Sequence, residues 1–428
     1  MGYKQFDWYS CLIVFVFSGM FLLVWGVLSS FQPSALQSGL WPGAVFSLDT
    51  VSLYLVFLSV FLWFSLSFLF GRVSTVSKVF VTLSVVSSLV CYCCVHCLVF
   101  WVFYELAILF LLLLLVVESP YSERYLASWY LLGYVVLTSL PMLLCLFYLS
   151  VESGSFDMRT WFTGNDEGAL LSYSVLLVLG VMFVTKVPLP PFHVWLPIVH
   201  AEASSIVSVC LSGYIMKLGL LGVCRMCCSV LPTGLFSSGY MLVCMALAVL
   251  FFFSAARELD GKRWLAFLSL SHIIVAAICL SVVSFSGSAL AFIFSVGHGL
   301  SAGVVFILLW LVYEVSGSRN WFVLKFCLSS SLLMRCLMAS GVCTVASLPP
   351  TLQFFTEVSV VSESGYVSLL FVYVFFLYLF FSGLVPLFLI GGLLSRHFSV
   401  SFGDAGVYGF FSSVFFLVLW SFIMFVVV

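Results

Sequence analysis

Four charged side chains lie inside stretches that are otherwise apolar enough to cross a membrane. They are Glu105, Lys186, Lys217 and Glu357. A charge at the centre of a bilayer costs roughly 2.5–3.5 kcal/mol on insertion scales, so such residues usually mark ion or proton pathways. A carboxylate and an amine that pair and separate there could drive proton uptake and release. The alternative for each residue is a purely structural pair, or a side chain that reaches the membrane surface.

Two histidines, His272 and His298, also lie in apolar stretches. Histidine changes its charge near neutral pH and can pass a proton between its two ring nitrogens. Together with the four charged residues and bridging water, the two histidines could form a proton relay. The sequence contains no nucleotide-binding loop, nucleophile elbow or zinc-ligand spacing that would indicate another chemistry.

The composition indicates where these residues are held. Of the 428 residues, 64% are hydrophobic and only 7% are charged, whereas soluble proteins carry about 25% charged residues. Because a spanning helix needs about 20 apolar residues, we expect an all-α polytopic membrane protein with about 13–14 transmembrane helices and short loops. The net charge of −1 argues against a nucleic-acid partner.

A repeated Leu-Pro-Pro motif predicts two interrupted helices. Residues 189–191 follow Lys186, and residues 348–350 precede Glu357. Broken helices in corresponding places are typical of two inverted repeats around a transport site, although proline is also ordinary at a helix start. We therefore expect interruptions at residues 187–191 and 348–357. The expected units are N-terminal helices (1–78), a first repeat (79–235), a second repeat (236–394) and a C-terminal helix (395–428).

Several individual spans can also be predicted. The first covers residues 8–30 and the second residues 48–70. Residues 79–117 are too many for one helix and should form two, joined by a turn near residues 93–97. Residues 126–149 form one span, which Pro141 is expected to kink.

The 15 cysteines favour packing rather than metal binding. Most lie in apolar helices, where free cysteine behaves as a small hydrophobic residue. The cluster Cys91, Cys93, Cys94, His96 and Cys97 could present ligands from one helix face, but we expect no metal there. The abundance of Phe, Val, Cys, Trp and Gly, with only two Asn residues, indicates a gene rich in T and G, as many organelle genes are.

The intramembrane residues, taken with their neighbours, resemble a known family. The chain is similar to subunit 4 of mitochondrial NADH:ubiquinone oxidoreductase (respiratory complex I), an antiporter-like membrane subunit. The resemblance rests on these blocks: Phe103-Tyr104-Glu105; Lys186, His193, Trp195-Leu196-Pro197, His200 and Glu202-Ala203; Lys217-Leu218-Gly219; Ser271-His272; His298-Gly299-Leu300; Leu348-Pro349-Pro350 with Glu357. The chain departs from the family at Ser204, usually proline, and at Ile198, often basic. The family's first helix of 14 is also expected to be missing.

The resemblance implies a role for each of these residues. Glu105 and Lys186 would form the ion pair of a half-channel. Lys217 would be the central relay lysine and Glu357 the carboxylate on the exit side. His272 and His298 would lie along the polar axis between them.

The resemblance also implies the setting. The chain would lie in the mitochondrial inner membrane as part of an NADH:ubiquinone reductase, beside antiporter-like subunits 2 and 5 and lipids such as cardiolipin. It would bind no cofactor, while NAD, FMN, iron–sulfur clusters and ubiquinone would belong to other subunits. Three alternatives stay open: a cation/proton antiporter subunit, a sister subunit (2 or 5), and an inactive structural subunit. Subunits 2 and 5 usually carry a lysine in place of Glu357, which favours subunit 4.

Overall fold

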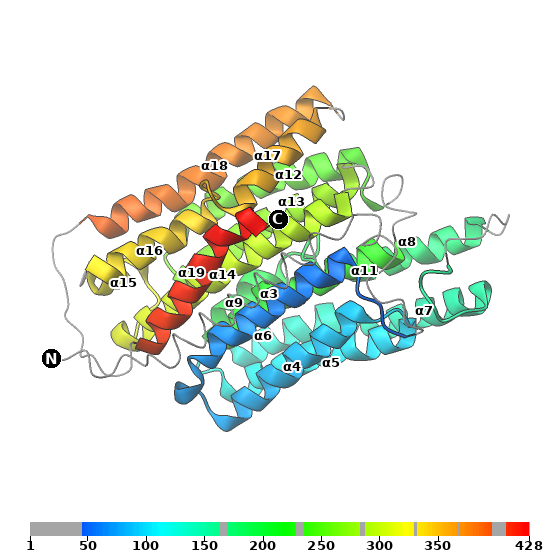
Figure 1. Cartoon of the computed structure of the whole chain (residues 1–428), viewed down its shortest axis with the longest axis horizontal. Coiled ribbons are helices and arrows are strands. Elements are labelled where there is room, and N and C mark those ends of the chain that lie inside the picture. Colours follow the sequence, from blue (N-terminus) through cyan, green and yellow to red (C-terminus); the bar gives the residue numbers. More distant parts are fainter. Residues whose placement is uncertain are drawn as a thin grey trace.

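The computed structural model describes residues 45–161, 169–227, 235–282, 287–328, 332–365, 368–395 and 408–427. Every regular element in these ranges is a helix, and the helices run roughly parallel in one elongated bundle (Figure 1). Ten helical segments in the described ranges are long and apolar enough to cross a membrane. The expectation of an all-α polytopic membrane protein is therefore confirmed. The expected first span, residues 8–30, and the question of a missing first helix lie outside the described residues.

The helices fall into an N-terminal and a C-terminal series. The first series is α3 (Thr50–Ser67), α4 (Thr75–Cys93), α5 (Cys97–Glu118), α6 (Arg124–Leu131), α7 (Ser139–Ser153), α8 (Ala169–Lys186), α9 (Trp195–Glu202), α10 (Ser205–Cys210) and α11 (Met216–Met226). The second is α12 (Ser238–Arg257), α13 (Gly261–Val282), α14 (Gly287–Ser316), α15 (Trp321–Leu328), α16 (Leu332–Val345), α17 (Leu352–Ser364), α18 (Leu369–Leu394) and α19 (Tyr408–Val427).

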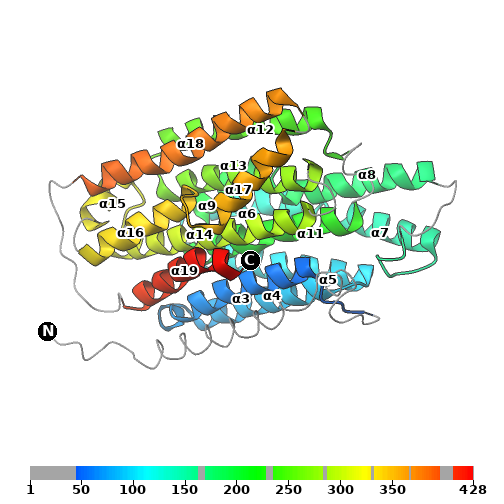
Figure 2. The same ribbon diagram turned by 45° about the horizontal axis from the view of Figure 1, so that its top comes forward.

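Three of the spans form the centre of the bundle. In the apolar stretch of each span, the share of residues that are buried is 100% for α10–α11, 94% for α14 and 89% for α13. The share is only 28% for α18 and for the α6–α7 span. Helices α4 and α5 lie along one edge, α12 and α18 along the other, and α14 lies between them (Figures 1 and 2). The fold therefore encloses α11, α13 and α14, which carry Lys217, His272 and His298, and leaves two apolar faces for lipid or neighbouring proteins.

Both predicted interruptions are present, although the second is shorter than the expected 348–357, because α17 already contains Glu357. Helix α8 ends at Lys186 and α9 begins at Trp195, while α16 ends at Val345 and α17 begins at Leu352. Carbonyl groups freed by a break inside a membrane need new donors. The indole Nε1 of Trp195 donates to the Thr185 carbonyl (3.1 Å), and the Tyr240 hydroxyl donates to the Pro190 carbonyl (2.6 Å). Side chains of the protein thus stabilise the first break.

The remaining span predictions hold in part. The two helices expected in residues 79–117 are confirmed, with the turn between Cys93 and Cys97. In the next span the irregularity is a π-helical turn, η2 (Leu132–Val136), which ends before Pro141. Proline at position 141 cannot donate to the Leu137 carbonyl and its ring crowds that turn, so the helix widens upstream of the proline. The short helix α15 was not predicted.

Cations gather at one end of the bundle. This end is where α3 joins α4, α5 joins α6, α12 joins α13 and α14 joins α15. It carries Arg72, Lys78, Arg124, Arg257, Lys262, Arg263, Arg319 and Lys325. The opposite end carries the ion pairs Arg225–Asp49 (3.0 Å) and Arg159–Asp157 (2.7 Å). Hydrogen bonds from Arg159 hold the pKa of Asp157 below its usual value. Lysine and arginine mark the side of a membrane protein that is not translocated, and we call this end the basic face.

Candidate functional site

Glu105 and Lys186 meet inside the bundle. Glu105 lies in the middle of α5, and Lys186 is the last residue of α8, at the first break. The amine Nζ of Lys186 donates to Glu105 Oε1 at 2.5 Å and lies 4.2 Å from the centre of the Tyr104 ring. The Lys186 side chain is 1% exposed. A pair held this far from water is stable only while both partners stay together.

Lys217 lies two residues after a second π-helical turn. The π-helical turn η3 (Leu211–Ile215) separates α10 from α11. A π-helical turn disturbs the regular backbone hydrogen bonding, and such turns are frequent at functional sites. The amine of Lys217 donates to the Ser212 carbonyl within this turn, and the whole residue is buried. The π-helical turn thus supplies an acceptor for an amine that has no carboxylate partner among the described residues.

Glycines bring the helix of Lys217 against the helix of Lys186. A Cβ atom added to Gly219 would lie 3.2 Å from the Phe183 carbonyl oxygen, and one added to Gly222 would overlap the Phe183 ring. Only residues without a side chain allow this approach. The helix α11 is therefore packed directly on the C-terminal end of α8, next to the Glu105–Lys186 pair.

This contact gives a first prediction, which concerns stability. The substitution Gly222→Ala should lower the thermal unfolding midpoint, because overpacking against a rigid ring costs about 1–3 kcal/mol. The matched control is Gly383→Ala on α18, where an added Cβ meets nothing within 4 Å. That control should leave the midpoint unchanged or raise it, since alanine favours helix more than glycine does. Equal midpoints for the two variants would contradict the tight α8–α11 contact.

His298 lies between the Lys217 segment and the second break. It is flanked by two glycines on α14. A Cβ atom on Gly299 would lie 3.1 Å from the Gly213 carbonyl oxygen in η3, and one on Gly297 would lie 3.1 Å from the Gln353 amide nitrogen in α17. The α14 backbone around His298 therefore contacts the π-helical turn on one side and the start of α17 on the other.

A hydrogen-bonded network joins His272 to Glu357, and the ring of His298 lies next to it. The rings of His298 and His272 lie 5.5 Å apart between centroids. His272 Nδ1 lies 2.7 Å from the Tyr378 hydroxyl and 3.0 Å from Gln353 Nε2. The Tyr378 hydroxyl donates to Glu357 Oε1 at 3.5 Å, and the Ser347 hydroxyl donates to the same oxygen at 3.1 Å. Every member of this network is buried.

Sequence reasoning did not single out Gln353, Tyr378 or Ser347. A usable signal was present for two of them, because Gln353 and Ser347 flank the second Leu-Pro-Pro motif. Tyr378 is one aromatic residue among many on α18, and only packing reveals that its hydroxyl faces Glu357.

His200, on α9, is fully buried with both ring nitrogens unpartnered among the described residues, and it stacks on Phe306 with centroids 5.0 Å apart.

A second polar cluster holds the end of the half-helix α9. The carbonyl groups in the last turn of a helix lack partners within the helix. Here the Ala201 carbonyl accepts from Arg319 Nη1, the Glu202 carbonyl from the Ser119 hydroxyl, and the Ala203 carbonyl from Lys262 Nζ (2.8 Å). Arg319 lies just after α14, Ser119 just after α5, and Lys262 at the start of α13. We call this arrangement the carbonyl clamp.

Tyr121 and Asp260 complete the carbonyl clamp. The Arg319 guanidinium lies 4.2 Å from the centre of the Tyr121 ring, and Lys262 Nζ lies 5.0 Å from it. Arg319 Nε also pairs with Asp260 Oδ2 at 3.3 Å. Burial raises the pKa of the Tyr121 hydroxyl, so that the ring remains neutral between two cations. Positive charge at a helix C-terminus also complements the helix dipole.

The cysteine cluster forms the turn between α4 and α5. The thiol of Cys91 donates to the Phe100 carbonyl (3.8 Å) and the thiol of Cys94 to the His96 carbonyl (3.3 Å). Within the described ranges, no three His, Cys, Asp or Glu side chains are grouped closely enough to share a metal ion. These thiols are weak donors to backbone carbonyl groups in a packed turn.

Comparison with known sequences gives a consistent result. Residues 95–384 match the family model described as NADH:quinone oxidoreductase/Mrp antiporter, TM. The NADH-ubiquinone oxidoreductase chain 4 of Ascaris suum is 28% identical over 65% of this chain and 66% of its own length. The chain 4 of Caenorhabditis elegans is 26% identical over 68% of each chain. The match therefore spans about two thirds of these relatives.

Solved structures share the fold. A chain of respiratory complex I from Thermus thermophilus superposes with a TM-score of 0.75 at 23% identity, over 89% of this chain and 81% of that one. A chain of the Mrp complex from a Dietzia species superposes with a TM-score of 0.74 at 15% identity, over 93% of this chain and 77% of that one. At these identities the likeness concerns the arrangement of helices alone.

Proposed function

Because the chain belongs to the NADH:quinone oxidoreductase/Mrp antiporter transmembrane family, we propose that it is a proton-translocating subunit of the membrane arm of respiratory complex I, corresponding to subunit 4. The observation that carries this proposal is the Glu105–Lys186 pair buried at a helix break. The names of the relatives and the carboxylate at Glu357 favour this subunit over subunits 2 and 5. The repeats, residues 79–235 and 236–394, each supply one broken helix and one charge beside it.

The proposed cycle starts at the ion pair. While the pair is closed, Glu105 stabilises the protonated amine of Lys186. When the helices shift and the pair opens, an unpaired ammonium is left in apolar surroundings, which is costly. Its proton then passes through water to the neutral amine of Lys217, on the helix packed against α8. Lys186 is left neutral until it is protonated again and the pair closes.

The second half of the path runs along α14. The proton passes from Lys217 by bridging water to His298, whose ring nitrogens have no protein partner among the described residues. It continues through His272 and the Tyr378 hydroxyl to Glu357. Histidine suits this role because one nitrogen can accept a proton while the other donates one. Glu357, held by Ser347, is the last acceptor before release.

The proposed setting follows from the relatives. The chain lies in the mitochondrial inner membrane with its basic face towards the matrix, beside antiporter-like subunits 2 and 5 and lipids such as cardiolipin. It carries out no redox chemistry itself. Electron transfer from NADH through FMN and iron–sulfur clusters to ubiquinone takes place in other subunits and drives the opening of the Glu105–Lys186 pair.

A second candidate function is a cation/proton antiporter subunit. The likeness to the Mrp complex chain over 93% of this chain favours it. Isolation of the native assembly distinguishes the two functions. The complex I assignment requires that NADH-oxidising and iron–sulfur subunits accompany this chain, whereas their absence and the presence of other antiporter subunits would support the second candidate.

The ion pair gives the second prediction. The substitution Glu105→Gln should strongly reduce proton transfer per NADH oxidised in the reconstituted assembly, because an uncharged amide cannot hold the Lys186 ammonium. Glu105→Asp should retain partial activity, because it keeps the charge on a shorter arm. The control is Glu118→Gln at the polar end of the same helix, which should pump normally. Normal pumping by Glu105→Gln would remove the ion pair from the mechanism and favour a structural subunit.

A further inference from the structure

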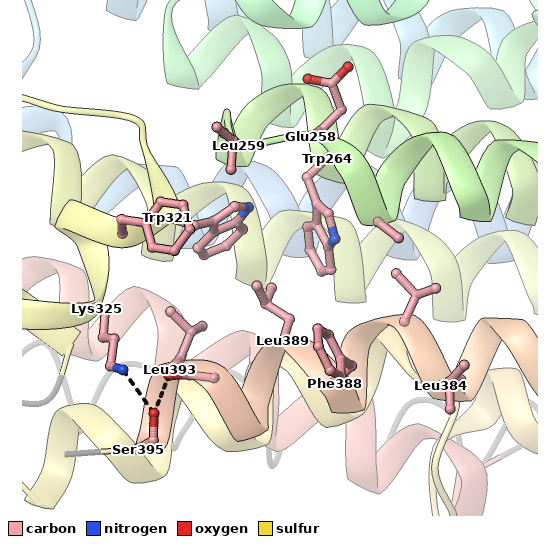
Figure 3. Close-up of a pocket in the computed structure, with 14 residues that line it drawn as sticks. Glu258, Leu259, Trp264, Trp321, Lys325, Leu384, Phe388, Leu389, Leu393 and Ser395 are labelled. Atoms are coloured by element: carbon pink, nitrogen blue, oxygen red, sulfur yellow. Dashed lines mark hydrogen bonds between the residues drawn. The ribbon is translucent and has the colours of Figure 1, made fainter.

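An apolar groove opens on the outer surface of the bundle near the basic face. Its volume is about 430 Å³, and it lies between α18 on one side and α15 with the α12–α13 connection on the other. Leu384, Phe388, Leu389 and Leu393 follow one another along α18, and the indole rings of Trp264 and Trp321 face them across the groove (Figure 3). None of these residues belongs to the proton path proposed above.

The groove is continuous with a surface that faces the membrane. Phe388 is 83% exposed, and the α18 span is only 28% buried. An apolar patch of this kind on a spanning helix contacts lipid or a neighbouring protein.

The end of the groove nearest the basic face is polar and positive. Lys325 Nζ donates to the Ser395 hydroxyl at 2.8 Å (Figure 3), and no carboxylate lies within ion-pair distance of Lys325 among the residues the structure describes. The one carboxylate of the lining, Glu258, is directed away from Lys325 (Figure 3). This end therefore offers an amine whose positive charge is not neutralised by the protein.

Two tryptophans place the groove at the membrane surface. The indole rings of Trp264 and Trp321 line its wall opposite α18 (Figure 3). Tryptophan is typical of the level where lipid headgroups meet acyl chains. A basic residue at that level attracts anionic lipid, so the charge of Lys325, which no carboxylate among the described residues neutralises, favours an anionic lipid as the occupant.

We propose that this groove is a binding site for an anionic phospholipid. One acyl chain lies along α18 against Phe388 and Leu389. The headgroup phosphate is held by the Lys325 amine and the Ser395 hydroxyl, and the glycerol backbone lies at the level of the Trp264 and Trp321 rings. The site would attach a lipid of the basic-face leaflet to the second half of the bundle, away from Lys217.

The test uses two neighbouring glycines of α18. A Cβ atom added to Gly391 or Gly392 meets no atom within 4 Å, but only Gly392 lines the groove. The intact assembly is purified with wild-type or substituted chain, depleted of lipid and titrated with phosphatidylglycerol or phosphatidylcholine, and bound lipid is counted by native mass spectrometry. Gly392→Leu should lose one bound phosphatidylglycerol per chain, whereas Gly391→Leu should retain it.

The charge is tested separately. Lys325→Ala should weaken phosphatidylglycerol binding roughly fivefold, the contribution of one lysine near an anionic lipid surface. It should weaken phosphatidylcholine binding less, because the choline ammonium already offsets the charge of the phosphate. Lys78→Ala, on the same face but outside the groove, is the control. A wild-type lipid count in Gly392→Leu would overturn the site, and would be expected if a partner protein covers the groove. Equal losses of both lipids in Lys325→Ala would overturn the anionic preference.

Discussion

Replacing Lys217 by methionine is expected to stop proton translocation while leaving the assembly intact. Lys217 is completely buried on the central helix α11, which packs against α8, the helix of Lys186. Methionine is flexible, apolar and of similar length, so it should fill the same space. The variant loses the one group able to accept a proton from Lys186 and release it again.

The expected loss is large. A positioned proton-transfer group contributes about a hundredfold or more to rate, so the coupled rate of NADH oxidation should fall by about that factor. The loss of stability should be small, because only the hydrogen bond from Nζ to the Ser212 carbonyl disappears, which costs roughly 1 kcal/mol. The measurement is proton transfer per NADH oxidised, together with the yield of intact assembly.

The control for Lys217 is Lys78→Met at the basic face, which should pump at the normal ratio. If Lys217→Met also pumps at the normal ratio and rate, the path does not run through α11. The hypothesis of a structural subunit would then gain support. A variant that fails to assemble would contradict the expectation that only a small polar group is lost.

Much of this geometry follows from the sequence because charge inside apolar sequence is expensive. Glu105 and Lys186 have few ways to avoid that cost other than meeting each other, and the structure pairs them. The Leu-Pro-Pro motifs predict both breaks, since proline removes backbone donors wherever it occurs. Both predictions depend on a free-energy cost that a single residue type carries wherever it occurs, a buried charge in one case and a proline in the other.

Other features depend on packing between segments far apart in the chain. No proline lies in the π-helical turn before Lys217, so the sequence does not predict the turn. The Ser212 carbonyl can accept from the Lys217 amine only because the backbone widens there. Tyr378 reaches Glu357 only because α18 packs near α17. The carbonyl clamp joins residues 119, 262 and 319 at one helix end, and no local pattern in the sequence indicates that these residues meet.

The carbonyl clamp leads to the last prediction, that Arg319→Leu lowers stability and weakens coupling together. Arg319 donates to the Ala201 carbonyl, pairs with Asp260 and lies on Tyr121. Leucine fills part of the space but leaves a carbonyl without a donor and a carboxylate without its cation. A hydrogen bond to a charged group contributes about 1.5–3 kcal/mol, so the thermal midpoint of the assembly should fall by several degrees.

The effect on coupling follows from what the carbonyl clamp holds. The half-helix α9 begins just after the break at Lys186, and Ser119 ties its other end to the segment after α5, the helix of Glu105. Loosening α9 therefore lets Glu105 and Lys186 move apart, and proton transfer per NADH should fall even at a temperature where the assembly is stable.

Arg263→Leu is the matched control, because Arg263 lies on the same face, is exposed and contributes nothing to the carbonyl clamp. Arg319→Lys should restore part of the midpoint, since lysine keeps the charge without the planar fork that reaches the Ala201 carbonyl and Asp260 together. A lowered midpoint with normal coupling would limit the clamp to a structural role, whereas unchanged values of both would show that α9 is held by packing alone.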